Sequence, residues 1–197
     1  MKYKAPRHGD RHDVEPGGRF ATNRPTVIAT ILGSCVAACL YDQGRKVAGM
    51  NHFLLAAPRY ARAMPMTHTD AGRYGIHAME LLLNDMFDLG ARKGDLRAKI
   101  FGGASVINSP QDNFLCVHEV NQRFIREYLA AEGIPIVSED LGGERGRVIF
   151  FNTETFAVMR RYVLGRRLIE VEDEEKSYWK PRAERPESQE GTITLFA

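Results

Sequence analysis

The sequence has few cysteines and no motif that is typical of a metal site. The three cysteines, Cys35, Cys39 and Cys116, are an odd number and too sparse for a disulfide scaffold, so at least one thiol stays reduced. The chain has no C-x-x-C pair and no H-E-x-x-H, and Cys35 and Cys39 do not have the spacing of a zinc knuckle. We therefore expect no metal, and the thiols are either nucleophiles or core residues.

A strong charge of one sign and long apolar runs are lacking as well. The net charge is +2, with 27 Lys and Arg interspersed with 25 Asp and Glu, so there is no broad basic field for nucleic acid. No apolar run approaches the roughly 20 residues that span a bilayer. Residues 1–20 also lack the apolar centre of a secretory signal. We expect a cytoplasmic protein with no direct membrane insertion and no nucleic-acid partner.

The length and composition predict one domain with a tail at each end. At 197 residues and 44% hydrophobic, the chain can bury one substantial core. Residues 1–20 have no periodicity and predict a flexible or loosely docked arm. The domain covers 21–170, and the charged, proline-containing residues 171–197 predict a disordered tail. The tail ends in the apolar "TITLFA", which is either a docking peptide or an ordinary terminus.

Runs of residues with high β propensity are interrupted by two amphipathic segments. "TVIATIL", "CVAACLYD" and "KVAGMNHFLL" predict three neighbouring strands, with a bend at Gly33 and Ser34. Apolar residues at helical spacing, each time followed by a glycine, predict helices over 70–90 and 117–133. Four further strands are predicted at "LRAKIF", "IPIVSEDL", "RVIFFN" and "FAVMRRYV", the last three joined as hairpins through "GGERG" and "TET".

This order of elements lacks strict alternation of strand and helix. It therefore predicts an α+β fold, in which mixed or antiparallel sheets pack as a sandwich with the two main helices on the outside. The glycine-rich "FGGAS" and "DLGGERGR" lack the Lys-Ser/Thr ending of a phosphate loop. Tight turns and close backbone packing explain them better, so no nucleotide or other cofactor is expected.

The segment "LGSC" places Cys35 directly after two turn-forming residues. A bend at Gly33 and Ser34 would display the thiol and present backbone N–H groups, including that of Cys35, to the oxygen of a carbonyl under attack. A thiol needs a base to form the nucleophilic thiolate, and His52 in "GMNHFLL" lies on the strand that follows the cysteine strand. The alternative for Cys35 is a small buried core residue, which is the usual role of a cysteine.

The remaining candidates are weaker. Cys39 lies within the apolar "VAACL" and Cys116 at the start of the second helix, so both are interpreted as structural. His68 is the other histidine placed to touch a substrate, because it lies in the long loop before the first helix. Glu139 and Asp140 are adjacent in a strand and point to opposite faces, which argues against a shared acid–base site.

Several segments in order resemble the CheD family, the chemoreceptor glutamine deamidases of bacterial chemotaxis. They include "TILGSCVAACLYD", "GMNHFLL", "RYGIHAMELLLNDM", "VNQRFIREYL" and "IPIVSEDLGGERGRVIFF". The resemblance implies a protein-glutamine deamidase, an amidohydrolase in which Cys35 is the nucleophile, His52 is the base and Thr30 completes the site. Some members have one more residue between this threonine and the cysteine, and a shift of one residue turns a strand side chain to the other face.

The resemblance also implies the partners. These are methyl-accepting chemotaxis receptors, whose glutamines become glutamates through a cysteine thioester, and a CheC-type phosphatase. The sequence leaves two alternative functions open. One is an adaptor that binds receptors or the phosphatase with weak or secondary catalysis, and the other is an unrelated thiol amidase that acts on another protein.

Overall fold

The computed structural model describes residues 11–55, 70–106 and 117–163. The described helices are α1 (Asp70–Asp88), the short 3-10 helix η3 (Lys93–Asp95) and α2 (Val117–Ala131). The described strands are β1 (Arg11–Asp13), β2 (Arg19–Thr22), β3 (Val27–Leu32), β4 (Val36–Asp42), β5 (Val47–Phe53), β6 (Leu96–Gly102), β7 (Ile136–Leu141), β8 (Arg147–Asn152) and β9 (Val158–Tyr162). The predictions for Cys116, His68, residues 1–10 and the tail 171–197 with "TITLFA" fall outside these residues.

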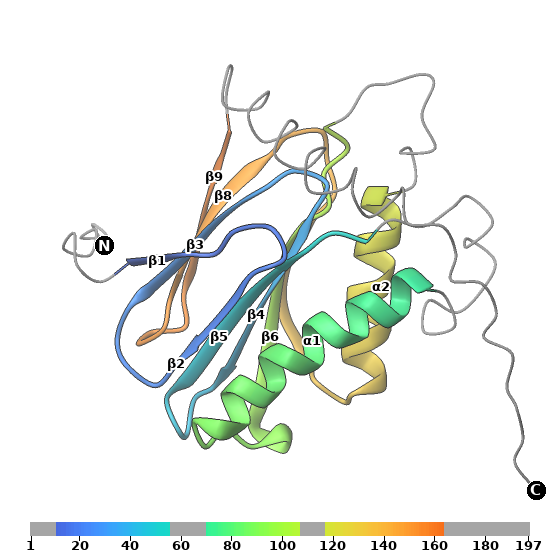
Figure 1. Cartoon of the computed structure of the whole chain (residues 1–197). Coiled ribbons are helices and arrows are strands. Elements are labelled where there is room, and N and C mark those ends of the chain that lie inside the picture. The colour runs from blue at the N-terminus through green and yellow to red at the C-terminus, as the bar shows by residue number, and fades with distance from the viewer. Residues whose placement is uncertain (1–10, 56–69, 107–116, 164–197) are drawn as a thin grey trace, which may run out of the picture.

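The strands form two sheets that are stacked face to face. One sheet has the order β2-β5-β4-β6-β7 and the other the order β1-β3-β8-β9, and both contain parallel as well as antiparallel pairs. Figure 1 shows α1 and α2 side by side on the outer face of the five-stranded sheet, with the four-stranded sheet on its other face. The predicted α+β sandwich with two outer helices is therefore confirmed.

The alternation of side chains along β4 and β5 produces two cores from the same strands. Val36, Ala38 and Leu40 of β4 pack beneath the two helices, together with apolar residues of α1 and α2. Ala37 and Cys39 point the other way, into the layer between the two sheets. Every residue of β5 is buried, because the helices cover one of its faces and the second sheet covers the other.

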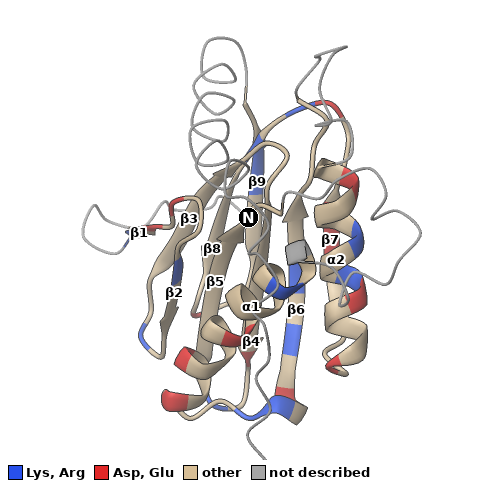
Figure 2. Cartoon of the chain, turned by 45° about the vertical axis from the view of Figure 1, so that its right-hand side comes forward, with Lys and Arg blue, Asp and Glu red and all other residues tan. Residues whose placement is uncertain are grey.

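The outer face of the helical layer is polar. Figure 2 shows both basic and acidic residues along α2. Arg123 and Glu127 form an ion pair within α2, and Arg126 reaches Glu139 of β7. Glu139 therefore points to the helical side while the adjacent Asp140 pairs with Arg147 of β8, as the sequence predicts for neighbours in a strand. No helix in the described ranges is both long and apolar enough to cross a membrane.

Two connections differ from the prediction. The sequence predicts three neighbouring strands over 26–55, but β3 lies in the four-stranded sheet while β4 and β5 pair in the other. The segment "GGERG" does not close a hairpin either, because β7 pairs with β6 and β8 pairs with β3. The "TET" turn does join a hairpin, between β8 and β9. Alternation and turn residues indicate strands and bends, but they do not say which partner a strand takes.

Part of the expected flexible arm is built into both sheets. Residues 11–13 form β1, which runs parallel to β3, and β2 begins at Arg19 beside β5. Val14 is buried in the core between the sheets. The sequence does not reveal these edge strands because they are short and polar. The other boundary of the expected domain, at residue 170, falls outside the described ranges.

Candidate active site

The turn Gly33–Cys35 is the point where the chain passes from the four-stranded to the five-stranded sheet. Each of its three carbonyl groups accepts a hydrogen bond. The carbonyl oxygen of Gly33 accepts from the N–H of Ala104 at 2.7 Å. That of Ser34 accepts from the side-chain amide of Asn121 at 3.1 Å, and that of Cys35 from the N–H of Gly103 at 2.6 Å. The loop after β6 and helix α2 therefore hold the backbone of this turn.

The glycines of "FGGAS" permit this close approach. Gly102 has φ +112°, and a Cβ atom there would stand 2.2 Å from the carbonyl oxygen of Cys35. A side chain is excluded both by that distance and by the backbone conformation. Close backbone packing, which the sequence predicts for this segment, is confirmed, and its neighbour is the turn that carries Cys35.

His52 and Thr30 meet across the two sheets. The Thr30 Oγ1 lies 2.8 Å from Nδ1 of His52 and donates its own proton to the Val14 carbonyl oxygen at 2.6 Å. Because the hydroxyl proton is used on a carbonyl, the same oxygen must accept from His52, which places the imidazole proton on Nδ1. The Nε2 atom then carries the lone pair that a general base needs.

The backbone of His52 is held on both of its hydrogen-bonding groups. Its N–H donates to the carbonyl oxygen of Gly18 at 3.0 Å, and its carbonyl oxygen accepts from the N–H of Gly17 at 2.7 Å. Across the β4–β5 ladder His52 stands opposite Ala37, on the face turned towards the second sheet. Cys35 precedes Ala37 by two residues and shares its core, so Cys35 and His52 are diagonal neighbours on one face.

All three side chains of this group are buried. Cys35 is 0% exposed, His52 2% and Thr30 4%, and the thiol lies in the core between the sheets. In this conformation a protein substrate has no surface of Cys35 to contact, so a reaction at this thiol requires the groups that cover it to move.

Cys39 shares the layer of Cys35 but lies within a strand rather than at the turn. It lies within β4, is fully buried, and packs in the same layer between the sheets. Burial raises the pKa of the Cys39 thiol, and the positive charge of Lys99 offsets only part of this effect. Cys39 therefore stays a neutral thiol near pH 7, and its predicted place in the core is confirmed.

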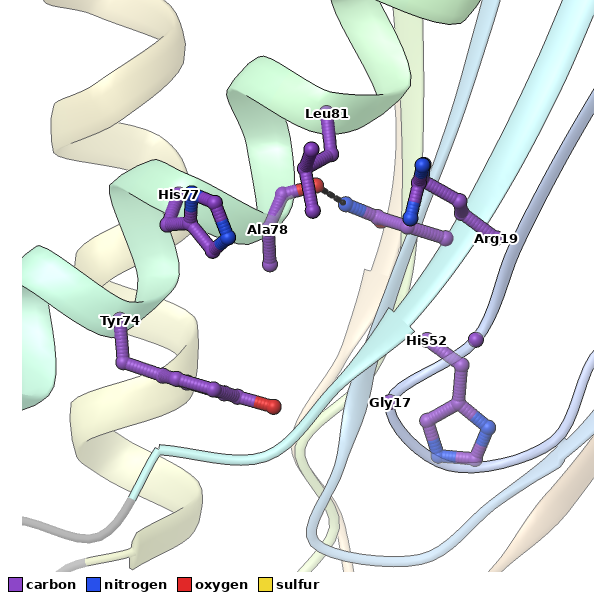
Figure 3. A pocket seen from close by; sticks show the side chains of 9 residues that line it. Gly17, Arg19, His52, Tyr74, His77, Ala78 and Leu81 are labelled. Carbon is purple, nitrogen blue, oxygen red and sulfur yellow. Dashed lines mark hydrogen bonds between the residues drawn. The ribbon is translucent and has the colours of Figure 1, made fainter.

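A small cavity, about 50 Å³, adjoins His52 on the side of α1. Figure 3 shows Tyr74 and His77 of α1 on one side of it, with His52 and Gly17 on the other. The dashed line in Figure 3 marks the bond from the Asn51 amide to the carbonyl of Ala78, which ties β5 to α1. Cys35 does not line this cavity, so the space reaches the histidine and not the thiol.

Two participants in this arrangement were not identified from the sequence. The Val14 carbonyl oxygen accepts the hydroxyl proton of Thr30. Every residue type has a backbone carbonyl, so the identity of residue 14 could not indicate this contact. Asn121 is fully buried on the inner face of α2 and bonds to the cysteine turn. A polar residue between Val120 and Phe124, on the apolar face of a predicted helix, is the signal that points to it.

Comparison with known proteins identifies the family. The family model described as CheD chemotactic sensory transduction matches residues 56–162. A Geobacter sulfurreducens protein named probable chemoreceptor glutamine deamidase CheD 1 is 49% identical over 93% of this chain and 92% of its own length. A Shewanella oneidensis protein named probable chemoreceptor glutamine deamidase CheD 2 is 44% identical over 87% of each chain. The chain belongs to the CheD family.

Proposed function

We propose that this protein deamidates specific glutamine side chains of methyl-accepting chemotaxis receptors in the cytoplasm, with Cys35 as the nucleophile. The observation that carries the proposal is the chain of contacts from Val14 through Thr30 to His52, which places the proton on Nδ1 and the lone pair on Nε2. Membership of a family whose relatives are named chemoreceptor glutamine deamidases supports the choice of substrate.

The reaction begins with transfer of the Cys35 proton to Nε2 of His52. The thiolate attacks the carboxamide carbon, and the carbonyl oxygen becomes an oxyanion that the backbone N–H groups of Ser34 and Cys35 hold. The imidazolium returns its proton to the leaving nitrogen, and the C–N bond breaks to release ammonia. The Thr30 hydroxyl keeps accepting the hydrogen bond from Nδ1 throughout and stabilises the positive charge of the imidazolium ring.

A thioester on Cys35 remains after ammonia has left. His52 takes a proton from a water molecule, whose oxygen attacks the thioester carbon. The C–S bond breaks and the proton returns to the sulfur, which leaves a glutamate on the receptor and restores the enzyme. Every step uses residues of the chain and water.

An adaptor role is favoured by one observation, the complete burial of Cys35. In that case the protein would bind receptors, or a CheC-type phosphatase, and catalysis would be weak or secondary. The same burial is compatible with catalysis if docking on the receptor uncovers the thiol. Measuring the reaction with the docked protein substrate, rather than with free glutamine, separates these two functions.

The test is incubation of the full chain with receptor cytoplasmic fragments, followed by peptide mass spectrometry. We expect glutamine peptides to gain the mass that accompanies replacement of a carboxamide NH₂ by a hydroxyl. Cys35→Ala and His52→Ala should abolish the gain, and the buried-thiol control Cys39→Ala should retain it. Binding of the fragments without any such gain in the wild type would overturn the deamidase proposal in favour of the adaptor.

A further inference from the structure

Asn121 joins the two segments that carry the cysteine and the histidine. It is 0% exposed within α2, and its amide group bonds to two main-chain groups. The Oδ1 atom accepts from the N–H of Leu55 at 2.7 Å, and Nδ2 donates to the carbonyl oxygen of Ser34 at 3.1 Å. Leu55 lies two residues beyond the end of β5, the strand that holds His52, and Ser34 directly precedes Cys35.

The bond to Ser34 also determines the direction of a second group. The carbonyl of Ser34 and the N–H of Cys35 belong to one peptide unit, and the described residues contain no cis peptide bond. In a trans peptide these two groups point in opposite directions within one plane. Because the carbonyl points to Asn121 on α2, the N–H of Cys35 points away from the helices.

That direction is the side on which the chemistry is expected. The side chain of Cys35 lies in the core between the two sheets, which takes only Val117, the first residue of α2, from the described helices. His52 is on the same face, where it contacts Thr30. The N–H of Cys35 is thus turned towards the layer in which a carbonyl attacked by the Cys35 sulfur would develop its negative charge.

We propose that Asn121 is a positioning residue for the oxyanion donor. It fixes the plane of the Ser34–Cys35 peptide and fastens that turn to the end of the histidine strand. This inference rests on the proposed function, in which the N–H of Cys35 stabilises the oxyanion. A merely structural asparagine would instead satisfy the buried N–H of Leu55 and affect folding alone.

Two reagents distinguish these roles, because only one of them forms an oxyanion. Acylation of a thiol by p-nitrophenyl acetate passes through a tetrahedral oxyanion, whereas alkylation by iodoacetamide is a direct displacement at a saturated carbon. Both need the thiolate, and mass spectrometry locates the label on Cys35. Neither reagent depends on receptor glutamines, so the measurement also stands apart from the deamidation assay.

The variants are Asn121→Leu, of similar volume without hydrogen-bonding groups, and Asn121→Ala, which removes the same groups without the steric demand of the leucine methyl groups. Circular dichroism checks that each variant is folded. The matched control is Thr153→Val. Thr153 is also buried, and its hydroxyl accepts from the N–H of Thr26 at 2.9 Å and donates to the carbonyl of Arg24 at 2.9 Å. At each site the substitution therefore removes one buried donor and one buried acceptor that form hydrogen bonds with main-chain groups. Thr153 differs in that it forms no hydrogen bond with the cysteine turn.

For the Asn121 variants we expect acylation of Cys35 to fall about 10- to 100-fold, somewhat less than the loss on deleting an oxyanion donor outright. Alkylation should stay within about twofold of wild type, and the kcat for receptor deamidation should fall with KM nearly unchanged. Thr153→Val should lower the melting temperature without separating the two labelling rates.

Equal losses of acylation and alkylation in the Asn121 variants, or no loss of either, would overturn the positioning role. If the wild type fails to deamidate receptors but shows the Asn121-dependent separation, the proposed function fails and the positioning role stands. If the wild type deamidates receptors and the separation is missing, the positioning role alone fails.

Discussion

Replacing Thr30 by valine tests the hydrogen-bond relay with the smallest change of shape. The valine keeps the branched side chain but removes the oxygen that lies 2.8 Å from Nδ1 of His52 and donates to Val14 at 2.6 Å. The Val14 carbonyl and the Nδ1–H group of His52 both lose this hydrogen-bond partner. Each loss costs about 1–3 kcal/mol in the free energy of unfolding. We therefore expect the variant to be about 2–6 kcal/mol less stable.

The effect on catalysis follows from the charge that His52 acquires in the reaction. When Nε2 takes the cysteine proton, the contact from Nδ1 to Thr30 becomes a hydrogen bond from a charged donor, worth about 1.5–3 kcal/mol. Its loss in the transition state corresponds to a fall in kcat of about 10- to 150-fold.

The assay is steady-state deamidation of receptor fragments at a temperature where the variant is folded, with the extent of folding followed by circular dichroism. Thr30→Ser keeps the oxygen and should recover most of the rate. Nitrogen-15 spectra of His52 should show the proton on Nδ1 in the wild type and in Thr30→Ser. A folded Thr30→Val protein that deamidates within threefold of wild type would refute the reasoning.

Two further predictions concern Cys39 and Gly102. Burial raises the pKa of Cys39, so above pH 8.5, where the thiol of the unfolded chain ionises, the unfolded state binds fewer protons and stability falls as pH rises. Cys39→Ala should reduce that slope by about 1.4 kcal/mol per pH unit in urea titrations, and an unchanged slope would contradict the assignment. Gly102→Ala should destabilise the fold and abolish reaction at Cys35, because its Cβ atom would lie 2.2 Å from the Cys35 carbonyl oxygen. Gly133→Ala is the control, since it shares a positive φ (+68°) but its Cβ atom meets nothing within 4 Å, and equal losses in both variants would count against the steric argument.

The choice between the two cysteines shows how far local sequence reasoning reaches. "LGSC" places Cys35 at a bend and "VAACL" places Cys39 within an apolar run, and the structure has them there. That both thiols would be fully buried in one layer was not visible in the sequence. By register His52 is a diagonal neighbour of both thiols. What separates them in the structure is the backbone, because Cys35 ends the turn that the loop after β6 and α2 hold, whereas Cys39 lies within β4.

The register of Thr30 is a second case. Sequence resemblance left one residue of ambiguity between the threonine and the cysteine, which in a strand decides the face of the sheet. The structure turns the Thr30 hydroxyl towards His52, because β3 lies in the opposite sheet and pairs with both β1 and β8. The pairing with β1 in turn brings the Val14 carbonyl to the hydroxyl, and no property of residue 14 could have predicted that.

By itself the sequence determined the family, the approximate span of both helices and the location of most strands. It also indicated the candidate site residues Thr30, Cys35 and His52. These features depend on local periodicity, glycine stops and ordered motifs, which a chain carries in its letters. The tertiary structure decided which strands pair, that residues 11–20 belong to the sheets, and that Asn121 and Val14 lie against the candidate site. Those are contacts between segments distant in the chain, and they are set by the packing of two sheets and a helix layer rather than by any neighbouring residue.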